Sequence, residues 1–126
     1  MVKATINKEH YACSVTNGSH EIVVDEPLEL GGTHQGFAPK GLLMASLASC
    51  VAITLRMYAD RKGWEIDKIE VEVNVGSENN QLLFLEEIVC TGPLSREQKD
   101  RLEDIAQKCP VSKILAAGNE IRSKVL

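Results

Sequence analysis

The sequence predicts an α+β protein: N-terminal antiparallel strands, a long buried central helix, a β-hairpin and two C-terminal helices. Two observations support this class. Apolar and polar residues alternate near the N-terminus and again at 69–75, which is the period of a half-buried strand. Between these regions lies the charge-free run LLMASLASCVAITL (42–55), which is rich in residues that favour helix. We expect one domain, because a chain of 126 residues is long enough to bury a single core.

Three strands are expected before residue 25. Segments 2–6 and 11–15 alternate between apolar and polar residues. The pair Asn17-Gly18 is a strong signal for a hairpin turn, because both residues tolerate positive φ. The chain then returns through 21–24 and enters a loop punctuated by glycine and proline, DEPLELGGTHQGFAP (25–39).

The central helix is expected from Leu42 to about Arg61, and Pro39 is suited to open it because a first helical turn needs no N–H there. Its apolar residues occur on every side up to Arg56, so the helix must be covered on every side. One small sheet cannot supply that cover, and we therefore expect a homodimer. The charge-free run is shorter than the roughly 20 residues that cross a bilayer. With no apolar signal segment at the N-terminus, the sequence predicts a cytoplasmic protein without a membrane partner.

The C-terminal part is expected to hold a hairpin and two helices. Segments 69–75 and 82–90 would pair across the turn GSENNQ. Ser95 and Gln98 match a capping box that opens an amphipathic helix, which Cys109-Pro110 ends. A short helix then begins, and the tail EIRSKVL (120–126) is a candidate final strand.

Composition argues against several functions. A net charge of −4 and an aromatic content of 4% disfavour nucleic-acid binding. The histidines lack ligand spacing and no C-x-x-C pair occurs, so we expect no metal and no cofactor. The acidic runs Glu86-Glu87 and Glu103-Asp104 are interpreted as solvated faces.

Four cysteines are the candidate reactive groups. Cys109 is a candidate N-cap of the helix that Pro110 starts, where unpaired N–H groups favour a thiolate; a cysteine that only tolerates a helix corner fits equally well. By its aliphatic context Cys50 is a small buried hydrophobe, and its reactivity would need a charged neighbour from elsewhere in the fold. Cys13 and Cys90 lie in expected strands, and we assign both to packing.

Three stretches together resemble the OsmC/Ohr family, named for osmotically inducible protein C and organic hydroperoxide resistance protein. They are DEPLELGG (25–32), the segment from G-x-x-P to KGW (36–64) and RLEDIAQKCPVSKIL (101–115). The resemblance implies that residues 1–126 form a single OsmC-like domain in an intertwined homodimer. It also implies a peroxiredoxin-like thiol peroxidase that reduces organic hydroperoxides, with Cys50 as the peroxidatic cysteine and Cys109 as the resolving one. An external thiol reductant would then restore both cysteines.

The chain departs from the family's pattern in two ways. Active members carry a glutamate in the first turn of the central helix, in the pattern P-x-E-L-L, where this chain has Gly41. They also use an arginine from the N-terminal strands, and this chain has no arginine before Arg56. The alternative hypothesis is therefore an OsmC-fold dimer that senses redox state or binds a small molecule without peroxidase activity.

Four further residues are candidates for the site. Lys40 is a candidate for electrostatic support of the Cys50 thiolate, although a lysine lacks the fork of a guanidinium. Phe37, Met44 and Leu47 are candidate walls of a substrate pocket, since apolar walls suit an organic peroxide. A third interpretation makes both Cys50 and Cys109 packing residues without any redox role.

Overall fold

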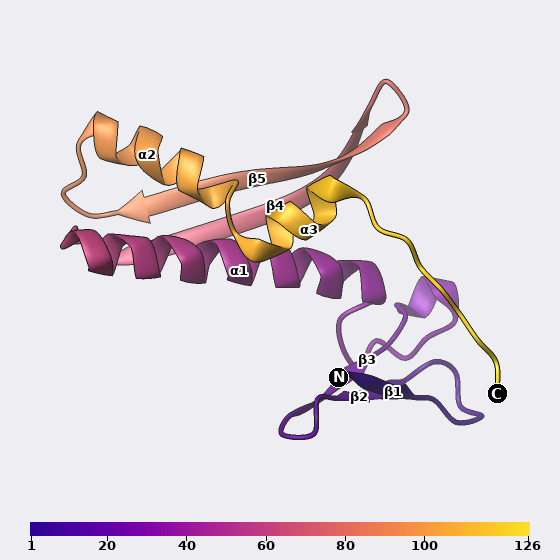
Figure 1. Ribbon diagram of the computed structural model, residues 1–126. Coiled ribbons are helices and arrows are strands. Elements are labelled where there is room, and N and C mark those ends of the chain that lie inside the picture. The colour runs from indigo at the N-terminus through magenta and orange to yellow at the C-terminus, as the bar shows by residue number, and fades with distance from the viewer. The chain divides into compact units, whose positions relative to one another are not determined.

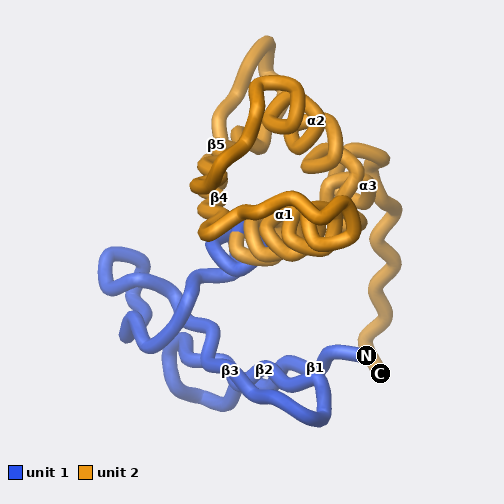
Figure 2. Tube along the Cα trace, turned by 90° about the vertical axis from the view of Figure 1, so that its left-hand side faces the viewer, with its two compact units in different colours: residues 1–44 blue, residues 45–126 orange.

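The computed structural model describes residues 1–126 and confirms the α+β class (Figure 1). Three helices and five strands follow one another in the expected order, with one additional short 3₁₀ helix. The chain divides into two compact units, residues 1–44 and residues 45–126, coloured blue and orange in Figure 2.

The first unit contains a three-stranded antiparallel sheet in the order β1-β2-β3. Its strands are β1 (Lys3–Thr5), β2 (Cys13–Thr16) and β3 (Glu21–Val24). The expected hairpin at Asn17-Gly18 is present: Gly18 has a φ of 95°, and the Asn17 side chain accepts hydrogen bonds from the backbone N–H of Ser19 and His20 at 3.0 and 2.8 Å. The turn residues therefore hold β2 and β3 together, as the sequence predicts.

A buried carboxylate organises the loop after β3. Asp25 is only 2% exposed, and its two oxygens accept five hydrogen bonds. The donors are the backbone N–H groups of Tyr11, Glu26, Thr33 and Gln35 and the Thr33 hydroxyl. A 3₁₀ helix, η1 (Leu28–Leu30), lies inside this loop. The hydrogen bonds to Asp25 hold the backbone of this loop in place between β3 and the next helix.

Helix α1 (Pro39–Lys62) is the long apolar helix, and it begins at Pro39 as expected. Its buried residues recur at helical spacing on one face: Leu47, Val51, Leu55, Tyr58 and Ala59. They form a core cluster with residues of the two C-terminal helices and of the hairpin. The helix ends at Gly63, whose φ of 68° is the left-handed conformation that glycine favours at this position.

The other face of α1 is uncovered. Ser46, Cys50, Ile53 and Met57 follow one another at intervals of three and four residues, which places them on one stripe. Ile53 is 59% exposed and Met57 is 67% exposed. By length and mean hydropathy α1 could also cross a membrane, but one such helix is weak evidence because core helices share these properties.

The hairpin consists of β4 (Lys68–Glu78) and β5 (Gln81–Thr91). Cys90, Ile88 and Glu86 alternate along β5 and share its inner face, opposite Ile69, Val71 and Val73 of β4. Glu86 is therefore half-buried beside apolar residues. The interpretation of the Glu86-Glu87 run as a solvated face is wrong for Glu86, because alternate side chains of a strand point to opposite faces.

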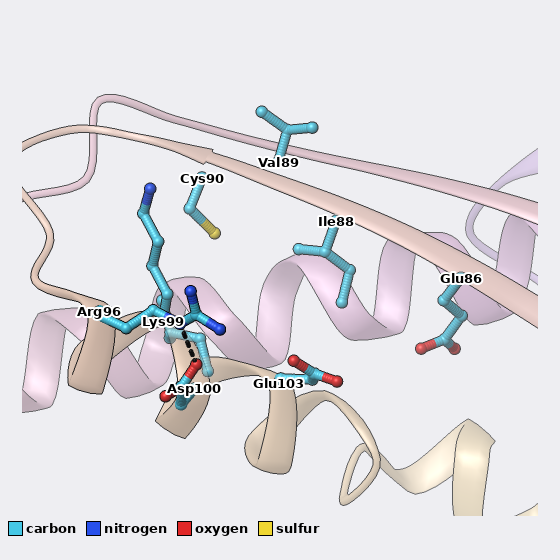
Figure 3. Close-up of a pocket in the computed structure, with 9 residues that line it drawn as sticks. Glu86, Ile88, Val89, Cys90, Arg96, Lys99, Asp100 and Glu103 are labelled. Atoms are coloured by element: carbon cyan, nitrogen blue, oxygen red, sulfur yellow. Dashed lines mark hydrogen bonds and ion pairs between the residues drawn. The ribbon is translucent and has the colours of Figure 1, made fainter.

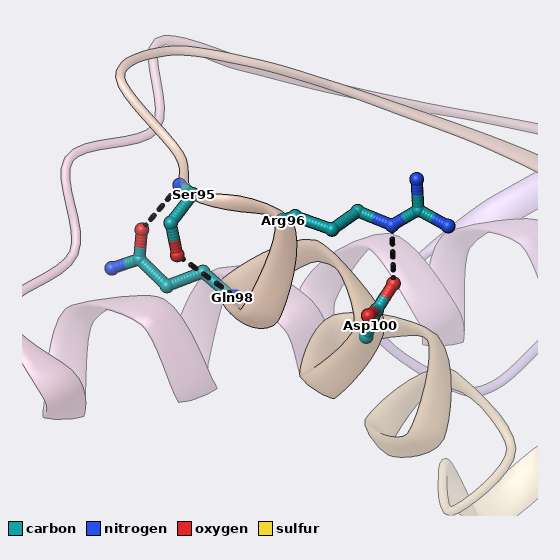
Figure 4. Close-up of polar contacts among 4 residues, drawn as sticks. All are labelled: Ser95, Arg96, Gln98 and Asp100. Atoms are coloured by element: carbon teal, nitrogen blue, oxygen red, sulfur yellow. Dashed lines mark hydrogen bonds and ion pairs between the residues drawn. The ribbon is translucent and has the colours of Figure 1, made fainter.

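The two C-terminal helices are α2 (Arg96–Ala106) and α3 (Pro110–Ala117). The predicted capping box opens α2: the backbone N–H of Gln98 donates to the Ser95 hydroxyl, and the Ser95 N–H donates to the Gln98 side chain (Figure 4). The expected final strand at 120–126 is wrong. Residues 118–126 form no strand, because no neighbouring strand pairs with their backbone groups.

Candidate active site

The Cys109 thiol lies at the N-terminus of α3. Cys109 has an exposed fraction of 0% and is the N-cap of this helix, with Pro110 in its first turn. Its sulfur accepts a hydrogen bond from the backbone N–H of Ser112 at 3.3 Å and lies 3.0 Å from the Ser112 hydroxyl oxygen. The expectation that Cys109 caps α3 is confirmed. Unpaired N–H groups and the positive end of the helix dipole favour negative charge at such a position.

Cys50 lies at the margin between the two faces of α1. It is half-buried and packs against the core cluster that contains Leu47, Val51 and Cys109. Its helical neighbours Ile53 and Met57 belong to the uncovered stripe. The apolar sequence context of Cys50 predicts a fully buried side chain. In the structure the thiol is only half-buried, because one side of its helix is uncovered.

One apolar cluster thus contains both cysteines of the resemblance. Cys109 is among its fully buried members and Cys50 among the half-buried residues packed against it. All four cysteines of the chain are free thiols in this structure. Both cysteines are therefore free thiols in contact with one apolar cluster, and Cys109 also caps a helix.

The other four candidate residues are distributed along α1 and the segment before it. Leu47 is buried in the core cluster, Met44 is half-buried, and Phe37 is 63% exposed. Lys40 is exposed in the first turn of α1, ten residues before Cys50. At 1.5 Å per residue that spacing corresponds to about 15 Å of helix axis.

The start of α1 also has room for a larger residue. A Cβ atom added at Gly41 would lie 3.6 Å from Cδ1 of Phe37, which is ordinary van der Waals contact. Crowding around the Cβ position therefore does not account for the glycine at residue 41.

Sequence reasoning missed a cavity of about 610 Å³ between β5 and α2 (Figure 3). Cys90, Ile88 and Glu86 line it from the strand, and Lys99, Leu102 and Glu103 line it from the helix. Burial raises the pKa of the Cys90 thiol, and the positive charges of Arg56 and Lys99 oppose that rise. The signal in the sequence was the alternation along β5, which puts these three strand residues on one face.

A second unpredicted cluster surrounds Tyr58. Its hydroxyl oxygen accepts a hydrogen bond from Nε of Arg101 at 3.0 Å, and the guanidinium of Arg61 lies 5.6 Å from the ring centroid. Trp64 packs edge-on against the same ring at 5.5 Å. The hydrogen bond from Arg101 is the main cause that lowers the pKa of Tyr58. This cluster joins α1 to α2.

The family model for OsmC-like proteins matches residues 32–124. The chain belongs to the OsmC-like protein family. The matched range includes all of α1 and the three cysteines of the apolar cluster, Cys50, Cys90 and Cys109. None of the curated proteins matches the sequence.

Solved structures of OsmC-like proteins share the fold of this chain. An osmotic-stress-induced and detoxification-response protein from Psychrobacter arcticus is 24% identical over 89% of this chain and 85% of its own, with a TM-score of 0.73. OhrB, the organic hydroperoxide resistance protein of Bacillus subtilis, is 26% identical over 90% and 87%, with a TM-score of 0.58. An organic hydroperoxide resistance protein from Elizabethkingia anophelis is 25% identical over 89% and 84%, with a TM-score of 0.62.

Proposed function

We propose that this OsmC-like protein is a thiol-dependent peroxidase that reduces organic hydroperoxides, with Cys50 as the peroxidatic and Cys109 as the resolving cysteine. The observation that carries the proposal is that these two cysteines, far apart in the sequence, belong to one apolar cluster. The names of two structural relatives, both organic hydroperoxide resistance proteins, agree with this substrate class.

The proposed cycle has three steps. The Cys50 thiolate attacks the outer oxygen of ROOH, the O–O bond breaks, and the products are a sulfenic acid on Cys50 and the alcohol ROH, which takes up a proton. The Cys109 thiol then displaces water from the sulfenic acid and forms the Cys50–Cys109 disulfide. Two equivalents of an external thiol reduce this disulfide, leaving both cysteines as thiols and the external thiol as its own disulfide.

The surroundings suit both roles. The cap position places the Cys109 sulfur beside the backbone N–H of Ser112 at the start of α3, where a helix N-terminus stabilises negative charge. The apolar residues around Cys50, Leu47 among them, suit the organic part of a hydroperoxide, and a partner subunit over the uncovered stripe would keep water from the sulfenic acid. Phe37 and Met44 are the further residues that we propose as walls of this pocket.

The active form in this proposal is a homodimer in the cytoplasm, and residues 1–126 act as a single domain. The uncovered stripe of α1 supports the dimer, because exposed Ile53 and Met57 on a long apolar helix need cover. Lys40 is proposed as the electrostatic support of the Cys50 thiolate. About 15 Å of helix separates Lys40 from Cys50 in one chain. The Lys40 charge would therefore act on the Cys50 thiolate over a long range, or the Lys40 of the partner subunit would supply it.

The direct test is the consumption of cumene hydroperoxide with a dithiol reductant in excess. We expect the wild type to reduce the peroxide catalytically, Cys50→Ser to lose the activity, and Cys109→Ser to stop after about one equivalent unless the reductant attacks the sulfenic acid itself. Cys13→Ser is the matched control and should retain the activity. If the wild type is no faster than Cys50→Ser, the peroxidase proposal is wrong.

A second candidate function is a non-peroxidase dimer that senses redox state or binds a small molecule. Gly41 in place of the family's glutamate, and the lack of any arginine before Arg56, favour it. The rate of alkylation of Cys50 as a function of pH separates the two functions. A thiol that is already ionised near neutral pH supports the peroxidase, and one that ionises only above the range of free thiols supports the binding protein.

A further inference from the structure

The lining of the cavity between β5 and α2 includes neither Cys50 nor Cys109. We name this cavity the Cys90 pocket, and its volume of about 610 Å³ is in the range typical of small-molecule sites. Ile88 and Leu102 give it apolar walls, from the strand and from the helix respectively. Figure 3 shows Cys90 and Ile88 pointing from β5 toward α2, whereas Val89 points away.

The two ends of the Cys90 pocket carry opposite charges. Lys99 and the Arg96–Asp100 ion pair lie at the end beside Cys90, the Glu103 carboxylate lies below Ile88, and the Glu86 carboxylate lies at the other end (Figure 3). The pKa of the Cys90 thiol agrees with this placement of Lys99. Burial raises that pKa, and the positive charge of Lys99 lowers it. The pocket therefore has Lys99 as its unpaired positive charge at one end, and two unpaired carboxylates, Glu103 and Glu86, from its middle to the other end.

Three of these charges have no partner within the chain. Arg96 is paired with Asp100, at 3.0 Å between Nε and Oδ1, but Lys99, Glu86 and Glu103 form no ion pair. Glu86 is also half-buried, and burial raises the pKa of its carboxyl group. Partial burial of a carboxylate without a cation is unfavourable, so a positively charged group at this end would stabilise the Glu86 carboxylate.

We propose that the Cys90 pocket binds a short zwitterionic peptide, with its carboxylate at Lys99 and its ammonium group between Glu86 and Glu103. Both ends of the ligand would then meet a complementary charge, which fixes its direction in the pocket.

The length of the pocket sets the size of the ligand. Cys90 and Glu86 are four residues apart along β5, which corresponds to about 14 Å at 3.4 Å per residue. The termini of an extended tripeptide are about 10 Å apart at the same rise, and the inward side chains shorten the remaining gap. A single amino acid is too short to reach both ends. The proposal goes beyond the peroxidase function and does not depend on it, since it uses neither reactive cysteine.

The test titrates trialanine into the full-length protein and follows backbone amide chemical shifts by NMR. We expect saturable shifts at millimolar peptide, centred on residues 86–90 and 99–103. Two blocked probes follow: N-acetyl-trialanine lacks the ammonium group, and trialanine amide lacks the carboxylate. Each blocked probe should bind roughly threefold to tenfold more weakly than the zwitterion.

The variants assign each charge. Glu86→Gln should weaken the binding of trialanine roughly threefold to tenfold, and it should largely abolish the preference of the protein for trialanine over N-acetyl-trialanine. Lys99→Gln should abolish the preference for trialanine over trialanine amide. Glu87→Gln and Lys108→Gln are matched controls, because both residues are exposed and lie outside the pocket. Cys50→Ser should bind as the wild type does, so a failed peroxidase proposal leaves this result intact.

Three outcomes would overturn the proposal. One is the absence of saturable shifts at the pocket residues. Another is equal binding of the zwitterion and the blocked peptides. The third is a loss of affinity in Glu87→Gln as large as that in Glu86→Gln, since that result would indicate a general charge effect instead of a bound ammonium group.

Discussion

The Cys109 sulfur accepts the backbone N–H of Ser112 at 3.3 Å and thereby caps α3. The proposed resolving thiol consequently has a structural role as well as a chemical one. Substitutions at this position must therefore separate stability from redox activity.

Cys109→Ala and Cys109→Ser make that separation. Serine is a good N-cap residue and alanine cannot accept the Ser112 N–H, so Cys109→Ala should be less stable than Cys109→Ser by about 0.5–2 kcal/mol. Urea unfolding of both variants measures the difference. Equal stability of the two would show that a hydrogen-bond acceptor at position 109 contributes no capping energy.

Asp25 makes the stability of the first unit depend on pH. The hydrogen bond from the Thr33 hydroxyl is the largest cause that lowers the pKa of Asp25, and the backbone N–H groups of Gln35, Glu26 and Thr33 add to it, while burial opposes it. Because the folded state holds the carboxylate at a lowered pKa, its contribution is present above the unfolded value near 3.9. It is lost as the pH falls through the folded value.

Asp25→Asn should therefore be less stable than the wild type at neutral pH, since an amide NH₂ replaces one accepting oxygen among five donors. The difference between the two should shrink as the pH falls toward 3. Unfolding in urea at several pH values measures it, with the exposed Asp60→Asn as the control. A difference that stays constant with pH contradicts the role of the Asp25 charge.

Gly41→Glu should stabilise the protein. The position lies in the first turn of α1, where a glutamate gains helix propensity over glycine and interacts favourably with the helix dipole, for a total of about 1 kcal/mol. Gly41→Ala is the control for propensity alone. Thermal unfolding of all three proteins gives the comparison, and a lower melting temperature for Gly41→Glu would show that this turn does not accept the side chain.

The uncovered stripe of α1 predicts that Ile53→Lys and Met57→Lys dissociate the proposed homodimer. A charge in the middle of a buried apolar interface is costly, so both variants should become monomers. Sedimentation velocity of the wild type and the variants measures the change. Gln107→Lys adds the same charge at an exposed position on another element and should leave the association unchanged. A monomeric wild type would contradict the dimer.

The contact between Tyr58 and Arg101 can be tested by titration. Arg101→Gln removes the hydrogen bond that lowers the Tyr58 pKa, so the pKa should rise toward the ordinary value near 10. In a Tyr11→Phe background Tyr58 is the only tyrosine, and its ionisation is read from ultraviolet absorbance. Arg122→Gln is the control. An unchanged titration of Arg101→Gln would exclude this hydrogen bond in solution.

The local signals in this sequence were reliable where neighbouring residues decide the structure. The hairpin at Asn17-Gly18, the capping box of Ser95 and the Cys109 cap depend on contacts within a few residues. The burial of Asp25 was not predictable, because its five donors meet only when the loop closes on itself.

The environment of Cys50 was also not predictable from its sequence neighbours. Its helix is apolar all round, and only the packed structure shows which face the hairpin and the C-terminal helices cover. Glu86 was predictable in part: alternation with Phe84, Ile88 and Cys90 placed it on the inner face, but its neighbours on α2 depend on tertiary packing.

The most direct test of the peroxidase proposal is the state of Cys50 after one equivalent of cumene hydroperoxide. Mass spectrometry of the non-reduced tryptic digest should show a peptide pair joined by a Cys50–Cys109 disulfide. In Cys109→Ser, dimedone should instead trap a sulfenic acid on Cys50. A Cys50 that remains a free thiol while the peroxide is left unconsumed would contradict the account.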